Sequence, residues 1–160
     1  MKNSMMVGIV RAVACVAVVG GLLVGPVGAA SASDASIKSV IKSYESKILV
    51  SEGHVVTAIG EYKTSGDPTG VQTAIAQAAN VLRSLKSAIA SQSASSPKIK
   101  EGKAKFEKGL RDVILAYQHL KKAFGAKKAS PQIAKAEASK ALSAIKKGNK
   151  ELRAGAKLLR

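Results

Sequence analysis

Basic side chains recur at helical spacing near the end of the chain. Lys146, Lys150, Arg153, Lys157 and Arg160 are separated by four, three, four and three residues, so on a helix they would form one stripe. Like charges at this spacing destabilise a helix by about 0.2–0.5 kcal/mol per pair. A merely solvated face would carry interspersed Glu, so the stripe favours a surface that binds an anion.

The positive charge extends over the second half of the chain. Residues 33–97 hold 6 basic and 5 acidic side chains, whereas residues 98–160 hold 18 and 5. An imbalance of this size between two halves indicates an anionic partner. The candidate binding residues are the basic side chains of this half that we expect to face solvent: Lys98, Lys100, Lys105, Lys108, Lys121, Lys122, Lys127, Lys128, Lys146, Lys147, Lys150, Arg153, Lys157 and Arg160.

The residue types limit what that partner can be. Lysine accounts for 20 of the 24 basic residues after position 32, and its amine acts as a point charge without the bidentate fork of arginine. The chain has no Trp, and no aromatic residue interrupts the stripe, so base stacking is not provided. We therefore expect adhesion to a polyanion without sequence specificity: a cell-wall polymer, an anionic lipid, a glycan or DNA.

Two other functional classes are compatible with the same residues. In one, the chain is a structural or partner-binding helical protein whose basic face meets an acidic protein, or whose apolar seams complete a homo-oligomer. In the other, an apolar ligand enters between the helices beside the Ala/Gly-rich last segment. The dependence of binding on salt concentration distinguishes the first class from polyanion binding. Contacts to phosphate weaken steeply with ionic strength, whereas a packed apolar interface does not.

No arrangement typical of a catalytic or cofactor site is found in the sequence. Cys15 is the only cysteine and lies in the N-terminal apolar segment, and no glycine-rich phosphate loop or G-x-S-x-G elbow is present. No Glu is followed by His three residues later, as a di-iron bundle requires. His54 and His119, the only histidines, lie beside apolar positions. We expect no enzyme, no metal and no cofactor.

Four segments carry the apolar spacing of long helices packed lengthwise, with steps of four and three residues. These seams begin at Ile37, Val71, Ile99 and Ala134 and predict helices over residues 35–63, 68–92, 97–124 and 131–159. The short connections predict an all-α, antiparallel, up-down-up-down four-helix bundle. A side-by-side or domain-swapped dimer of helical hairpins would satisfy the same seams. Lys103 falls on the third seam, and we expect its stem to follow the core edge to the surface.

Local signals mark the ends of these helices. The pairs Asp67-Pro68, Ser96-Pro97 and Ser130-Pro131 each place a capping side chain before a proline that needs no amide hydrogen. Asp34 or Ser36 is predicted to cap the first helix. Gly125 is predicted to end the third.

Glycines recur seven residues apart in three of the predicted helices, as Gly53/Gly60, Gly102/Gly109 and Gly148/Gly155. Each glycine inside a helix costs roughly 0.5–1 kcal/mol relative to alanine. The last two pairs lie on or beside a seam, so they predict a close approach of the third and fourth helices. The first pair lies on the outward side of its helix, where the sequence offers no explanation.

Residues 1–32 have the pattern of a secretory signal peptide. Lys2 and Arg11 precede an uncharged run over residues 12–24, and Ala30-Ser31-Ala32 matches a signal peptidase site. Thirteen residues reach about 20 Å as a helix, short of the ~30 Å hydrocarbon core. We expect cleavage after Ala32, a single domain over residues 33–160 and a secreted or cell-envelope location. An uncleaved anchor, or a lipoprotein through Cys15, would be the alternatives.

Overall fold

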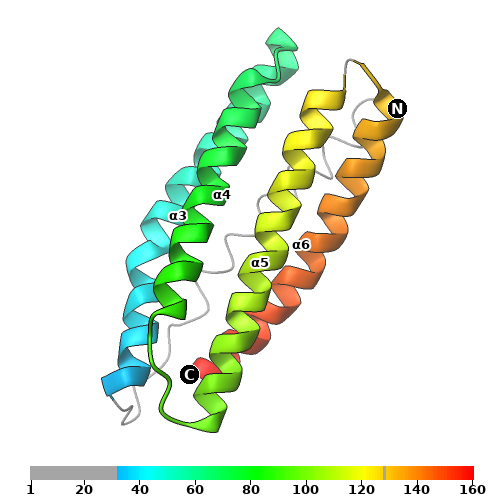
Figure 1. Cartoon of the computed structure of the whole chain (residues 1–160). Coiled ribbons are helices and arrows are strands. Elements are labelled where there is room, and N and C mark those ends of the chain that lie inside the picture. The colour runs from blue at the N-terminus through cyan, green and yellow to red at the C-terminus, as the bar shows by residue number, and fades with distance from the viewer. Residues whose placement is uncertain (1–31, 128) are drawn as a thin grey trace.

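Four α-helices and no strand make up the part of the chain that the computed structural model describes, residues 32–127 and 129–160. The helices are α3 (Ala32–Ser65), α4 (Thr69–Ala90), α5 (Pro97–Ala126) and α6 (Pro131–Leu159) (Figure 1). Each bound lies within three residues of its predicted position. The predicted signal peptide, apart from Ala32, and Lys128 lie outside the described residues.

Side-chain oxygens cap α5 and α6 as the sequence indicates. Ser96 and Ser130 accept hydrogen bonds from the amides three residues later, at 3.2 and 3.5 Å. Helix α4 begins one residue later than predicted: Pro68 is its N-cap residue, without a side-chain cap, and Asp67 before it accepts the amide of Thr69 at 3.0 Å. Each bond satisfies a donor that the first turn of a helix leaves without an intrahelical partner.

The predicted cap of the first helix is wrong. Helix α3 already begins at Ala32, so Asp34 and Ser36 lie inside it. No glycine or proline stands between Ala32 and the first core residue, Ile37, and nothing local stops the helix from extending toward the N-terminus.

The predicted end of α5 at Gly125 is also wrong. The helix continues to Ala126, and Gly66 (φ 70°) is the only described residue in the left-handed region. A β-carbon on Gly125 would lie 2.5 Å from the side-chain amide of Gln72. That amide donates to the Lys121 carbonyl at 3.3 Å. Gly125 therefore provides space for a contact between α4 and α5 and does not terminate α5.

The apolar seams form the core of the described chain. All seam residues are buried except Tyr44 and Lys103, which confirms the periodicity on which the helices were predicted. Phe106 and Tyr117 of α5 are among the largest fully buried side chains. None of the four described helices is both long and apolar enough to cross a bilayer.

Helices α5 and α6 form the closest pair (Figure 1). Gly102 lies against Gly155 and Gly109 against Gly148, so residue numbers rise along one helix as they fall along the other. A β-carbon on either Gly109 or Gly155 would lie 2.8 Å from a carbonyl oxygen of the opposing helix. The predicted close approach is confirmed. It fixes the rotation of α6 about its axis and hence the direction in which its other side chains point.

Candidate polyanion-binding surface

The basic stripe of α6 faces solvent, and its first four residues have no ion-pair partner among the described residues. Lys146, Lys150, Arg153 and Lys157 are all exposed, because Gly148 and the rest of the α6 seam are held against the core. None of the four forms an ion pair with another described residue. Arg160, the last residue of the predicted stripe, is exposed and its carbonyl accepts from the Lys38 amine at 3.3 Å. The name "α6 stripe" is used below for the first four residues.

Three other predicted binding residues are already neutralised by acids. Lys105, Lys108 and Lys147 lie along the junction of α5 and α6. Their partners are Glu101 at 3.4 Å, Glu151 at 2.7 Å and Asp112 at 4.0 Å, respectively. The hydrogen bond from Lys108 holds the pKa of Glu151 below its usual range. These lysines therefore contribute less net positive charge to a ligand than the α6 stripe does.

The remaining predicted residues lie at the ends of α5. Lys98 and Lys100 are exposed at its beginning, and Lys121 and Lys122 are exposed near its end. Lys127 stands 4.7 Å from the centre of the Tyr62 ring, a cation–π contact that joins the end of α5 to α3. The structure thus separates the predicted site into an open stripe on α6, a neutralised group and two clusters at the helix ends.

Sequence reasoning missed Arg83, which joins one of those clusters. Arg83 of α4 lies with Lys121 and Lys122 at a groove whose apolar lining includes Ile75 and Ala79. Arg83 donates to Asn80 at 2.6 Å. It belongs to the nearly neutral half of the chain, and only the packing of α4 on α5 brings it beside the two lysines. The groove therefore combines three cationic side chains with an apolar lining.

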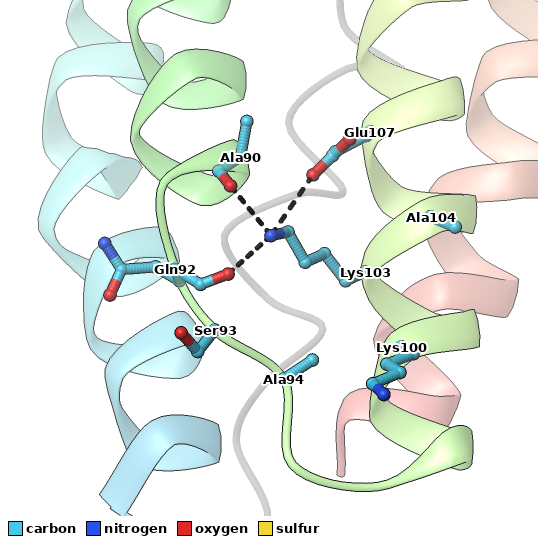
Figure 2. Close-up of a pocket in the computed structure, with 8 residues that line it drawn as sticks. All are labelled: Ala90, Gln92, Ser93, Ala94, Lys100, Lys103, Ala104 and Glu107. Atoms are coloured by element: carbon cyan, nitrogen blue, oxygen red, sulfur yellow. Dashed lines mark hydrogen bonds and ion pairs between the residues drawn. The ribbon is translucent and has the colours of Figure 1, made fainter.

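Lys103 does not extend to solvent as expected (Figure 2). Its amine donates to the carbonyls of Ala90, at 2.8 Å, and of Gln92, and lies 3.9 Å from Glu107. Its side chain is 18 % exposed. The last carbonyls of a helix lack intrahelical donors and attract cations, so Lys103 completes the C-terminal end of α4. This lysine is structural and does not belong to the anion-binding surface.

A carboxyl group and a phenol are buried in the interior. Glu52 of α3 is 6 % exposed and Tyr117 of α5 is 1 % exposed. Neither Glu52 Oε1 nor Tyr117 Oη has a hydrogen-bond partner among the described residues. Burial raises the pKa of Glu52 to about 8, and burial followed by the charge on Glu52 raises the pKa of Tyr117. Glu52 is therefore mostly a neutral acid at pH 7.

The two histidines have different surroundings. His119 Nδ1 lies 2.7 Å from Glu137 Oε2, and Lys140 donates to Oε1 of the same carboxylate at 2.7 Å. These hydrogen bonds, first from Lys140 and then from His119, lower the pKa of Glu137 to about 2. His54 is exposed on α3. Among the described residues no group of three or more His, Cys, Asp or Glu is arranged to hold a metal ion.

Comparison of the chain with protein-family models, with curated proteins and with solved structures gives no match. Two features distinguish the basic surface of the chain. The α6 stripe is exposed and forms no ion pair with a described residue, and Arg83, Lys121 and Lys122 gather at one groove.

Proposed function

We propose that the chain adheres to a linear polyanion, without reading its sequence, through the exposed basic surface of α6 and of the α4–α5 groove. The supporting observation is the contrast within one helix pair. Lys105, Lys108 and Lys147 have acidic partners, whereas the four residues of the α6 stripe have none among the described residues. Exposed, unpaired cations along one line attract the closely spaced phosphate, sulfate or carboxylate groups of a polymer or membrane surface.

The location and topology are part of this proposal. We infer that residues 1–32 are a cleaved secretory leader, so that Ser33 begins the mature chain, and that the four helices form an antiparallel up-down-up-down bundle. The first inference is supported by the charged, apolar and small-residue regions in order along residues 1–32. The second is supported by the short connections between the helices. Polyanions available outside the cytoplasm include cell-wall polymers, anionic lipids, glycans and free DNA.

A matched pair of variants tests the stripe. One variant replaces Lys146, Lys150, Arg153 and Lys157 with Gln. The control makes the same change to Gln at Lys105, Lys108, Lys140 and Lys147. All four of these lysines have acidic partners. Both variants lose four positive charges, so net charge is the same in each, and only the position of the loss differs.

Binding to duplex DNA of random sequence and to anionic lipid vesicles is then measured over a range of salt concentrations. For DNA, the stripe variant should lose about 0.9 in the slope of log K against log salt for each phosphate contact removed, or roughly 3–4 in all. The control should lose much less. Equal losses would mean that the attraction is diffuse. No loss in either variant, with either probe, would favour the alternative class, a structural protein that binds an acidic protein or its own copies.

A further inference from the structure

The outward side of α3 carries an apolar stripe that nothing in the described structure covers. Leu49, Gly53, Val56 and Gly60 follow one another at steps of four, three and four residues and so share one face of the helix. Leu49 is 54 % and Val56 43 % exposed. A β-carbon on either glycine would meet no atom within 4 Å. These four residues are called the α3 stripe below.

The same alternation of glycine and larger residues already joins two helices of this chain. In the α5–α6 pair, a β-carbon on Gly109 would meet Leu152 at 2.6 Å, and one on Gly148 would meet Val113 at 2.8 Å. In this pair the glycines lie opposite glycines, and both Gly109 and Gly148 are also met by a larger side chain of the other helix, which runs in the opposite direction. Glycines seven residues apart, with one larger residue between them, provide close antiparallel packing here.

We propose that the α3 stripe binds the α3 stripe of a second copy of the chain, forming an antiparallel, two-fold symmetric homodimer. The stripe is complementary to itself in that orientation. When Gly53 lies level with Val56 of the second copy, Gly60 lies level with Leu49 of the second copy. Because the two-fold axis repeats each contact, four glycine positions receive four larger side chains, as an isologous interface requires.

Charge complementarity supports the same register. Glu45 and Lys63 are eighteen residues apart, so both lie on the same flank of the α3 stripe. Neither forms an ion pair within the described chain. In the antiparallel register Glu45 of one copy lies within one residue, about 1.5 Å along the axis, of Lys63 of the other. A parallel pair would keep Glu45 of one copy and Lys63 of the other about 27 Å apart along the axis, so only the antiparallel orientation brings these opposite charges together.

This dimer does not depend on the proposed polyanion binding. It would place two α6 stripes on one particle and raise the apparent affinity for a repetitive ligand through effective concentration. Its test uses no ligand, so the failure of either proposal can be recognised separately.

Sedimentation equilibrium of the protein, purified after expression of the full-length sequence, should show one chain mass at low concentration and two at high concentration. Gly60→Leu places a side chain in space that is open in one copy but occupied by Leu49 of the second copy. It should weaken the dimer by about tenfold or more and leave circular dichroism unchanged. The matched control Gly70→Leu also enters open space but lies on α4, and it should not change association.

A charge exchange tests the register. Glu45→Lys and Lys63→Glu should each weaken the dimer, and the double variant should restore it. A chain that stays monomeric at the highest attainable concentration would overturn the proposal. So would a dimer that is indifferent to Gly60→Leu and to both single charge changes, the behaviour expected of exchanged helical hairpins.

Discussion

The carbonyl oxygen of Gly148 lies 2.8 Å from the position that a β-carbon on Gly109 would occupy, and the Leu152 amide nitrogen is equally close. Both neighbours are backbone atoms, which a side-chain rotation cannot move away. Gly109→Ala must therefore separate α5 from α6. We expect a loss of about 1–3 kcal/mol from overpacking, of which the better helix propensity of alanine recovers up to about 1 kcal/mol.

Urea denaturation of dilute protein checks this expectation, with Gly53→Ala as the control. Gly53 also lies inside a helix, but a β-carbon there meets nothing within 4 Å. The control should gain roughly 0.5–1 kcal/mol. If both alanines changed the urea midpoint equally, α5 and α6 would not be in backbone contact in solution.

Replacing Lys103 with Met should weaken the turn between α4 and α5. Met keeps an unbranched stem of similar length but lacks the amine that donates to the Ala90 and Gln92 carbonyls. Hydrogen bonds from a charged group contribute about 1.5–3 kcal/mol, and we expect a loss of that order in the free energy of unfolding. Lys100→Met, at an exposed position lining the same hollow, should change it by less than about 0.5 kcal/mol. Similar midpoints for the two variants would contradict the role assigned to Lys103.

Glu52 should make the chain less stable as the pH rises. Its pKa is about 8 in the folded chain and 4.5 for the ordinary group, so above pH 4.5 the unfolded chain releases a proton that the folded chain retains. The contribution is fully favourable below pH 4.5, declines as the pH rises, and is lost above pH 8. At about 1.4 kcal/mol per pKa unit the decline amounts to roughly 3–5 kcal/mol.

Glu52→Gln removes this titration while nearly preserving the side-chain shape. Denaturation midpoints of the two proteins, measured from pH 4 to pH 9, should diverge steadily, with the Gln variant gaining relative to the natural chain as the pH rises. Parallel curves would mean that Glu52 ionises normally and is therefore hydrated.

Glu137 should have the opposite effect, in acid. Lys140 and His119 lower its pKa to about 2, so its contribution is present above pH 4.5, the ordinary value, and is lost as the pH falls toward 2. Thermal midpoints of Glu137→Gln should lie below those of the natural chain at pH 6 and meet them near pH 2. A constant difference across this range would assign the loss to packing and not to the carboxylate.

The helices could be predicted because their signals are local. The apolar residues of a seam such as Ile99 to Phe124 recur about once in every turn of the helix. A Ser-Pro pair specifies the first turn by its own geometry. Local signals were not sufficient at Asp34, which was predicted to cap α3, or at Gly125, which was predicted to end α5. In the second case the close neighbour of the glycine is the side-chain amide of Gln72, more than fifty residues earlier in the sequence.

The candidate site was less predictable, because neutralisation depends on which helix faces which. Composition and spacing identified the exposed α6 stripe. The acids that pair with Lys108 and Lys147 lie on the opposite helix, about forty residues away in sequence, and no local pattern relates them. Arg83 joined the basic groove for the same reason. Glu52 resembles a surface residue in the sequence, and only the fold buries it.

The hydrogen bond from Lys38 to the Arg160 carbonyl places the beginning of α3 and the end of the chain at one end of the molecule (Figure 1). A protein or label fused ahead of α3, in a chain that begins at Ala32, or after Arg160 would therefore leave from the same side. The fused protein or label would not crowd the turn at residues 66–68, because this turn lies at the far end of the helices. Because the beginning of α3 lies near Arg160, a chain that begins at Ala32 can also be circularly permuted. A short linker from Arg160 to Ala32, with new termini at residues 66–68, would keep all four helices and reverse the order of the near-neutral α3 and the basic half along the chain.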